Sequence, residues 1–399
     1  MQTISTFLVF ALRLFLLTTG AQAHNDVIVG AERMDSLLAL TGGKRVGLAV
    51  NPTSILVRTK THLLDALLAQ GVEVKQIFAP EHGFRGMEDA GARVKNHLDA
   101  QTGIPVISLY GKHFKPTAAE LSGLDVIVFD MQDVGARFYT YISTMHYLME
   151  ACAEQGIAFV VLDRPNPNDY VDGPVRKPGY RSFVGIHPVP VLHGLTVGEL
   201  AMMINGEGWL RDGRRCPLTV IRMENWRHGD PYPLPVKPSP NLPNEQAVRL
   251  YPSLCLFEGT GVSVGRGTCF PFQALGYPNP EAGDFTFTPA PIAGLDSDPL
   301  HKNKTCYGMD LRKDPFPGGL SLHFLLDFYS RLGKNGKQFF TRAQWFDLLA
   351  GSKELRMQIV SEYTEKEIRA AWQPDLERYR ELRRKYLLYP DYETGRVSH

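Results

Sequence analysis

The chain has 399 residues, of which 44% are apolar and 21% are charged, as is ordinary for a soluble globular protein. Because one compact core rarely serves so long a chain, its length predicts two domains. Its 43 basic and 42 acidic residues nearly cancel, so no strong positive field would draw the protein to nucleic acid or to an anionic membrane.

The N-terminal stretch MQTISTFLVFALRLFLLTTGAQA is an apolar run that ends in small residues. This pattern predicts a secretory signal peptide over residues 1–23, cleaved before His24. A membrane anchor is the alternative, but Arg13 interrupts the run and disfavours a stable span. No later segment is long and apolar enough to cross a bilayer, so we expect a periplasmic or secreted protein.

After this segment, short apolar runs alternate with amphipathic helical patterns, such as the one that ends at Gly156. Near-continuous apolar strands alternating with helices predict a Rossmann-like parallel α/β sheet covered on both faces. We assign this domain to residues 24–232. The expected strands are residues 45–50, 72–79, 104–110, 125–130 and 158–163.

A polar loop follows each expected strand. In chain order these loops are NPTS, PEHGFRG, GKHFK, MQDVGARFYTY and RPNPN. In a parallel α/β sheet such loops emerge at one carboxyl edge, where ligands bind, so we expect them to converge in space. No GxGxxG follows the first strand and no GxxxxGK[ST] occurs, which disfavours a nucleotide site. We therefore expect no cofactor.

The proline-dense stretch DPYPLPVKPSPNLPNEQ interrupts this alternation and marks the expected domain boundary. The remainder, residues 233–399, mixes a glycine-rich loop with strand-like pieces and helices, which predicts a smaller α+β domain. In its last helical pattern Trp372, Leu376 and Tyr379 recur at helical spacing, as on a docking face.

Glu81 is the first candidate for catalysis. It lies between Pro80 and His82 in the stretch FAPEHGFRG, at the carboxyl end of an expected strand. Partial burial raises the pKa of a carboxylic acid, which suits a general acid. The alternatives are that Glu81 caps the following turn or pairs with Arg85. His82 either shares in proton transfer or bonds to the backbone.

The segment DMQDVGARFYTYIS supplies a second group of candidates, Asp133, Arg137 and Tyr139. Carboxylate, amide and tyrosine side chains suit a polyhydroxylated substrate, and an arginine suits an anionic group. The alternative is that Asp133 caps the following helix while Arg137 pairs with Asp130.

Three further loops carry candidates for ligand binding. Asn51 opens the loop NPTS, and Asp163 and Asn166 lie in LDRPNP, where the prolines fix the loop shape. His193 precedes a helix start in HGLTVGE, in which a threonine and Glu199 match a capping box. This match favours a structural role for Glu199.

In the C-terminal part, Glu258 and Arg266 lie on the glycine-rich loop FEGTGVSVGRGTCFPFQ. Its glycines either allow the backbone to approach a ligand closely or simply form tight turns. The five cysteines show no CxxC spacing, which disfavours zinc and leaves any disulfide pairing open. Neither HExxH nor GxSxG occurs, so we expect no metal site and no serine nucleophile.

Seven strings occur in order over nearly all of the mature chain: NPTS, APEHGFRG, FDMQDVGARFYTYI, LDRPNP, HGLTVGELA, PSPNLP and FEGTGVSVGRGT. Together they resemble the NamZ-type exo-β-N-acetylmuramidases, a family long described only as a bacterial domain of unknown function. The resemblance implies a Rossmann-like domain, a smaller C-terminal domain and an active-site cleft between them. It also implies release of N-acetylmuramic acid from the non-reducing ends of peptidoglycan fragments, in cell-wall turnover or salvage.

The resemblance makes Glu81 the expected catalytic carboxylate, with Asp133 as base or as the group that orients the substrate's acetamido group. The expected partners are peptidoglycan fragments or muramyl disaccharides. The alternative is a non-catalytic periplasmic muropeptide-binding protein with the same cleft. The full expected set for the sugar site is Asn51, Arg85, Arg137, Tyr139, Asp163, Asn166, His193, Glu258 and Arg266.

Overall fold

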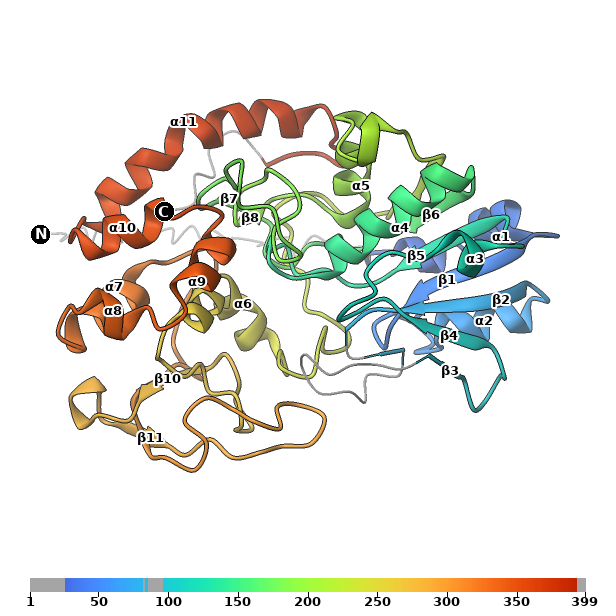
Figure 1. Ribbon diagram of the computed structural model, residues 1–399. Coiled ribbons are helices and arrows are strands. Elements are labelled where there is room, and N and C mark those ends of the chain that lie inside the picture. Colours follow the sequence, from blue (N-terminus) through green and yellow to red (C-terminus); the bar gives the residue numbers. More distant parts are fainter. Residues whose placement is uncertain (1–25, 82, 85–95, 393–399) are drawn as a thin grey trace, which may run out of the picture.

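The computed structural model describes residues 26–81, 83–84 and 96–392, which form two packed regions (Figure 1). The N-terminal region is built on a mostly parallel sheet. The C-terminal region combines a small antiparallel sheet with most of the later helices. The predicted fold class, a Rossmann-like α/β region joined to a smaller α+β region, is confirmed.

Seven strands form the central sheet in the order β3-β4-β2-β1-β5-β6-β9. Every neighbouring pair is parallel except β3 with β4. The five strands expected from the sequence are all present, whereas the edge strands β3 and β9 are not predicted. The strands are β1 (Arg45–Val50), β2 (Glu73–Ala79), β3 (His97–Leu98), β4 (Pro105–Ser108), β5 (Val126–Asp130), β6 (Ala158–Leu162) and β9 (Leu218–Ile221).

Helices cover both faces of this sheet, as the apolar strands predict. Side chains of β1 alternate between two hydrophobic cores: Val46 and Leu48 pack in the core that contains α1 and α2, and Ala49 packs in the core that contains α4 and α5. Helix α4 ends at Gly156, whose φ of 68° suits a glycine. The helices are α1 (Met34–Thr41), α2 (Leu63–Ala69), α3 (Ala118–Leu121), α4 (Tyr141–Gln155) and α5 (Val197–Gly206).

The C-terminal region begins with α6 (Glu245–Leu254), directly after the proline-dense crossover. A three-stranded antiparallel sheet follows in the order β10-β12-β11. The remaining elements are β10 (Ala274–Tyr277), β11 (Phe285–Phe287), β12 (Cys306–Asp310), α7 (His323–Arg331), α8 (Gly336–Phe339), α9 (Ala343–Ala350), α10 (Glu354–Val360) and α11 (Glu365–Arg384). The small pair β7 (Val171–Asp172) and β8 (Leu192–His193) belongs to the N-terminal region.

One hydrophobic core runs through both regions. Phe129 of β5 and Met145 of α4 belong to the same cluster as Phe257 and Phe328 of the C-terminal region. The long helix α11 spans both regions (Figure 1) and buries its predicted docking face. The predicted boundary before residue 233 therefore separates two blocks of sequence that share a core.

Three further observations bear on the predicted function classes. All five cysteines are free, and Cys269 alone among them is exposed. Across residues 26–81, 83–84 and 96–392, no helix is long and apolar enough to span a membrane. The same residues contain no group of three or more His, Cys, Asp or Glu side chains arranged to hold a metal ion.

Candidate active site

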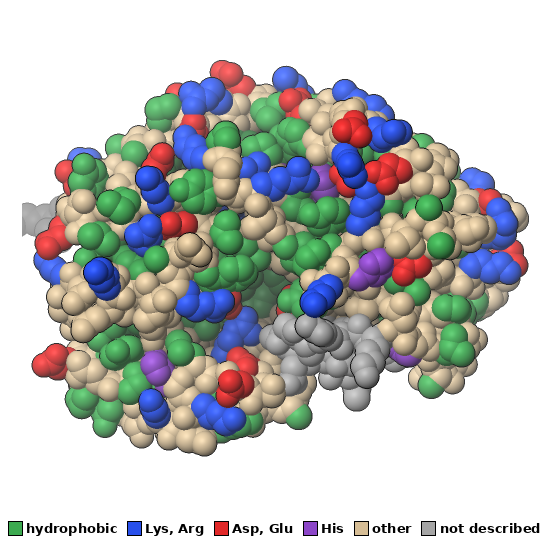
Figure 2. Space-filling model, viewed as in Figure 1, with side chains coloured by type: hydrophobic (Ala, Val, Ile, Leu, Met, Phe, Trp, Pro, Cys, Tyr) green, Lys and Arg blue, Asp and Glu red, His purple; other side chains and the backbone are tan. Residues whose placement is uncertain are grey.

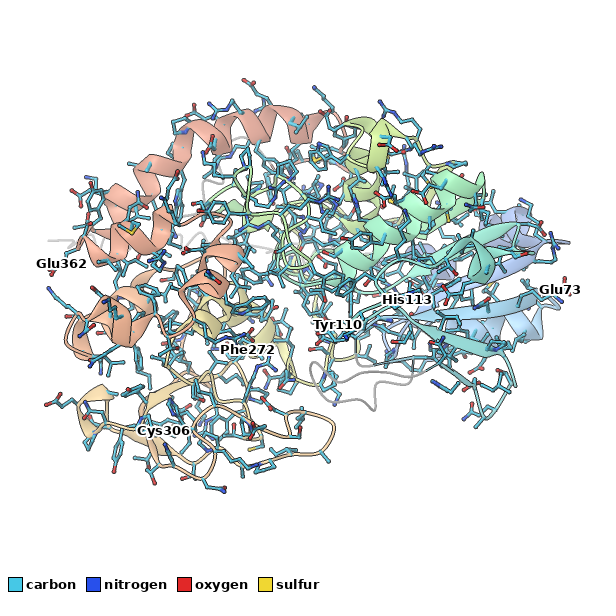
Figure 3. The ribbon with its side chains drawn as sticks, viewed as in Figure 1. Glu73, Tyr110, His113, Phe272, Cys306 and Glu362 are labelled. Atoms are coloured by element: carbon cyan, nitrogen blue, oxygen red, sulfur yellow. The ribbon has the colours of Figure 1, made fainter. Side chains whose placement is uncertain are left out.

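The loops after β1, β2, β4, β5 and β6 leave the sheet at its carboxyl edge. The chain runs from β1 outward through β2 to β4 and returns to β5 on the other side of β1, so the topological switch point lies between β1 and β5. Figure 2 shows the surface hollowed between the two regions. In Figure 3, Tyr110 from the loop after β4 and Phe272 from the C-terminal region lie on the two sides of this opening. We call this opening the sheet-edge cleft.

Glu81 follows β2 at this edge and is partly buried. The turn around it closes where the Gly83 N–H donates to the Pro80 carbonyl at 3.1 Å. The Thr140 hydroxyl lies 3.5 Å from Glu81 Oε2 and donates to it. Burial, followed by the charge and hydrogen bond of Glu81, raises the pKa of Tyr110 far above its ordinary value. Tyr110 therefore stays protonated and is a second donor to the carboxylate.

Tyr139 lies in the turn before α4, and Tyr141, the first residue of that helix, is close enough to Glu81 to feel its charge. Their rings meet edge to face at a centroid distance of 4.7 Å. Both hydroxyls donate to the Pro238 carbonyl, at 2.8 Å and 3.2 Å. Burial raises the pKa of Tyr141, and the charges of Glu81 and Asp133 raise it further. The phenol of Tyr141 therefore lies in the field of both carboxylates, while Tyr139 helps to hold the proline-dense crossover in place.

The loops after β1 and β5 are locked together by buried hydrogen bonds. Asn51 Oδ1 accepts from the Thr53 N–H at 2.9 Å and from the Thr53 hydroxyl at 2.6 Å. Thr53 Oγ1 in turn accepts from the Gln132 N–H at 2.9 Å. Asn51 is 1% exposed, so the structure places this predicted ligand-binding residue beneath the cleft, as part of its support.

Asp133 is 6% exposed and is held by its own loop. Its Oδ2 accepts from the Gly135 N–H at 2.7 Å and lies 3.5 Å from His193 Nε2. Within the described part of the chain, Asp133 Oδ1 has no hydrogen-bond partner. The alternative in which Asp133 caps α4 is wrong, because the N-cap residue of that helix is Thr140. The structure thus brings two predicted residues, Asp133 and His193, into one buried pair.

Glu258 and Arg266 form an ion pair in the C-terminal region. Arg266 Nη2 and Nε donate to Glu258 Oε1 at 2.7 Å and 3.2 Å, and the guanidinium lies 5.0 Å from the ring centroid of Phe272. Their side chains are 22% and 24% exposed. Both charges also act on the pKa of Tyr110, so this pair forms the wall of the cleft that faces the sheet edge.

Arg137 is buried inside the protein and does not occupy the position expected for contact with substrate. It is 1% exposed, and its guanidinium donates to three backbone carbonyls at 2.7–2.8 Å, one of them in α9. These bonds tie the two regions together. The alternative pairing with Asp130 is wrong, because Arg164 makes that buried ion pair at 2.6 Å.

Asp163 and Asn166 are likewise engaged with the protein itself. Asp163 is fully buried and accepts from the hydroxyls of Thr196 and Tyr389. Burial, and then the nearby charge of Glu199, raises its pKa to about 6. The Asn166 amide nitrogen donates to the Leu195 carbonyl at 3.0 Å, and its amide oxygen accepts from the Asn168 N–H of its own loop at 2.9 Å. The predicted capping box of Thr196 and Glu199 is present at the start of α5.

His82 and Arg85 lie outside the described residues, so their expected roles stay predictions. Tyr110 and Thr140 are neighbours of the site that the sequence analysis does not single out. The position of Tyr110 in the sequence could have marked it as a site residue, because it is the last residue of an expected strand, directly before the polar loop GKHFK.

Comparisons with known proteins identify the family of the chain. Two family models match the chain, the N-terminal domain of exo-β-N-acetylmuramidase NamZ over residues 46–246 and its C-terminal domain over residues 249–389. The chain is 38% identical over 372 residues to the peptidoglycan β-N-acetylmuramidase NamZ of Bacillus subtilis, covering 87% of each chain.

Solved structures show the same likeness. A DUF1343 family protein from Bacteroides fragilis matches with a TM-score of 0.84 and 44% identity, covering 92% of this chain and 100% of that one. A second DUF1343 protein from the same organism matches with a TM-score of 0.78 and 32% identity, covering 91% of this chain and 99% of that one. The chain described here therefore belongs to the NamZ exo-β-N-acetylmuramidase family.

Proposed function

We propose that the protein is a glycoside hydrolase that releases N-acetylmuramic acid from the non-reducing ends of peptidoglycan-derived fragments, in cell-wall turnover or salvage. The observation that carries the proposal is the setting of Glu81, a partly buried carboxylate at the switch edge of the sheet, with Thr140 and Tyr110 as donors. Membership of the family supports it, because the relative from B. subtilis is named a peptidoglycan β-N-acetylmuramidase.

Glu81 is the general acid in this proposal. Its proton passes to the glycosidic oxygen as the bond from that oxygen to the sugar's anomeric carbon breaks. Water then supplies the hydroxyl that the carbon gains, and the remaining proton of that water restores the acid form of Glu81. Tyr110 and Thr140 fix the orientation of the carboxyl group. Such positioning is needed because proton transfer requires a donor within hydrogen-bond reach of the leaving oxygen.

Asp133 supports the reaction from behind the cleft wall. Asp133 is buried and accepts a hydrogen bond from the Gly135 N–H. We therefore assign it a role in holding the loop and the tyrosines, and not the role of a base that removes a proton from water. Two groups are then candidates for the second catalytic role, on the opposite side of the sugar. They are the partly exposed Glu258 and the substrate's own 2-acetamido group.

Arg266 is the recognition residue for the lactyl carboxylate of N-acetylmuramic acid. Its side chain is partly exposed on the C-terminal wall, and its Nη1, which is a buried atom, has no hydrogen-bond partner among the described residues. A guanidinium binds a carboxylate through paired hydrogen bonds. This assignment replaces Arg137, whose guanidinium is already bound to backbone carbonyls.

The substitution Glu81→Gln tests the proposal. It keeps the shape of the side chain and removes the transferable proton, so we expect hydrolysis of a chromogenic N-acetylmuramic acid glycoside to fall roughly 10²- to 10⁴-fold. Glu73→Gln is the matched control, because Glu73 is exposed at the opposite end of the same strand. Near-normal turnover by Glu81→Gln would exclude Glu81 as the acid.

A non-catalytic muropeptide-binding protein is the alternative, and family membership does not favour it. The two functions differ in one measurable product. The hydrolase releases free N-acetylmuramic acid from muramyl disaccharides, detected by mass spectrometry, whereas a binding protein retains its ligand intact.

We propose in addition that the protein is exported and acts in the periplasm or outside the cell. The support is the apolar N-terminal run with its small-residue ending. Mass spectrometry of the mature protein is expected to find an N-terminus at His24. A full-length N-terminus in the mature protein would contradict export by a cleaved signal.

A further inference from the structure

A second cavity, of about 1130 Å³, lies on the other side of the proline-dense crossover. Of the residues expected at the sugar site, Asn166 lines this cavity, whereas Glu81 and Arg266 do not, and neither does Tyr110. Pro238 lines the cavity while its carbonyl accepts the hydroxyls of Tyr139 and Tyr141. The crossover is therefore a partition, with the sheet-edge cleft on one side and this crossover cavity on the other.

The lining of the crossover cavity has more basic side chains than its acidic side chains can pair with. Each acidic side chain in its lining has a basic partner: Asp169 with His228, Asp230 with Arg227, Glu245 with Arg249 and Asp391 with Arg383. The cavity nevertheless has further cations, which those acids do not neutralise.

Three of these cations have no acidic partner among the described residues: Lys237 on the crossover and Arg380 and Arg384 on α11. Arg380 makes one long bond of 3.4 Å to the Val171 carbonyl. Arg380 and Arg384 are four residues apart and so share one face of the helix. Arg383, which is 2% exposed, adds a buried Nη2 without a hydrogen-bond partner in the described chain.

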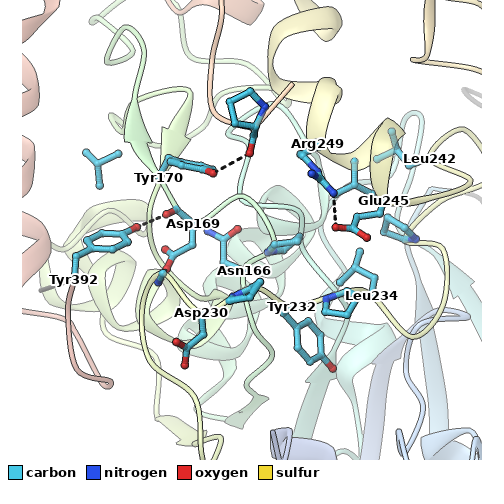
Figure 4. Close-up of a pocket in the computed structure, with 18 of the residues that line it drawn as sticks. Asn166, Asp169, Tyr170, Asp230, Tyr232, Leu234, Leu242, Glu245, Arg249 and Tyr392 are labelled. Atoms are coloured by element: carbon cyan, nitrogen blue, oxygen red, sulfur yellow. Dashed lines mark hydrogen bonds and ion pairs between the residues drawn. The ribbon is translucent and has the colours of Figure 1, made fainter. Parts of the chain in front are cut away.

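Much of the remaining wall is apolar or aromatic. In Figure 4, Tyr170 and Tyr392 lie on the left of the cavity, Leu234 and Leu242 on the right, and Tyr232 below. Prolines of the crossover fix the backbone there, so little conformational freedom is lost when a ligand binds. A cavity of this size is suited to a ligand larger than one sugar ring.

We propose that the crossover cavity binds an acidic oligopeptide. Separated cations on two elements match carboxylates spaced along a chain, whereas a single phosphate would call for cations converging on one point. The tyrosine and proline surfaces pack against the peptide between its charged groups. This site is distinct from the sugar site and does not depend on the proposed hydrolase activity.

Fluorescence anisotropy at low ionic strength tests the site with the full-length mature protein. The probe is a labelled short peptide of alternating glutamate and alanine, and its control has glutamine in place of glutamate. We expect the acidic probe to bind and the glutamine probe to bind at least about tenfold more weakly. Absence of binding, or equal binding of the two probes, overturns the proposal.

The triple variant Lys237→Gln, Arg380→Gln, Arg384→Gln locates the site. It is expected to bind the acidic probe about tenfold more weakly or worse and to hydrolyse a chromogenic muramic acid glycoside at the normal rate. Lys366→Gln is the matched control, because Lys366 is exposed on the same helix outside the cavity. Unchanged binding by the triple variant contradicts the assignment, whatever the outcome for Glu81→Gln.

Discussion

The two walls of the sheet-edge cleft are built differently. The N-terminal wall is attached to the ends of parallel strands, and Asn51, Asp133 and Tyr141 are buried beneath it in hydrogen-bonded loops. The C-terminal wall carries the partly exposed pair of Glu258 and Arg266 on a glycine-rich loop. The difference fits the proposed division of labour, in which the sheet fixes Glu81 as the acid and the loop supplies Arg266 for recognition.

The buried pair of Arg164 and Asp130 is the strongest test of the rigid wall. Arg164→Met leaves Asp130 charged and buried without a partner, so we expect the free energy of unfolding to fall by about 3–5 kcal/mol, measured by urea denaturation. The matched control is Arg249→Met, because the ion pair of Arg249 with Glu245 is partly exposed and its loss costs about 0–1 kcal/mol. Equal effects of both variants would contradict a wall that depends on buried charge.

His228 gives the N-terminal region behind this wall a pH dependence, through its bonds to Asp169 and Glu199. Burial lowers its pKa, but hydrogen bonds to Asp169 and Glu199 outweigh burial and raise it to about 9. A raised histidine pKa stabilises the fold fully below its ordinary value of 6.5, and this stability is lost as the pH rises through about 9. We expect unfolding free energy to fall by up to about 3 kcal/mol over that interval.

The substitution His228→Gln is the control for this pH effect. It removes the titrating group, so its unfolding free energy is expected to change less between pH 6.5 and pH 9.5 than that of the unsubstituted protein. Parallel pH profiles for the two proteins would show that other groups cause the loss.

Tyr110 belongs to the N-terminal wall, but charges of both walls act on its pKa, so it tests their cooperation. Tyr110→Phe removes one donor to the Glu81 carboxylate and keeps the ring, so we expect kcat on the chromogenic glycoside to fall about 10- to 100-fold, since a hydrogen bond to a charged group contributes about 1.5–3 kcal/mol. Circular dichroism checks that the fold is retained. Full activity would remove Tyr110 from the site.

We expect the smallest effect from a substitution in the C-terminal wall. Arg266→Gln should raise KM about tenfold with kcat nearly unchanged, because it weakens recognition of the lactyl carboxylate in ground and transition states alike. A glycoside of N-acetylglucosamine, which lacks that carboxylate, serves as the control substrate. If kcat falls as far as in Glu81→Gln, the proposed division between the walls is wrong.

The sheet and its polar edge were predictable because strand and helix periodicity are local properties of sequence. The same holds for the capping box of Thr196 and Glu199, whose residues lie within one turn. The partners of Arg137 were not predictable, because backbone carbonyls of distant loops bind its guanidinium. Every residue has such a carbonyl, so the sequence does not indicate which ones take part. The pairing of Asp130 with Arg164 likewise required the sheet order.

The end of the chain completes the N-terminal region. After α11, the Leu388 N–H donates to Glu199 and the Tyr389 hydroxyl donates to Asp163, both of them buried carboxyl groups beside β6 and α5. The N-terminal region therefore lacks some of its internal hydrogen bonds until residues 388 and 389 have been translated. Its folding is completed only after the C-terminal region has been made.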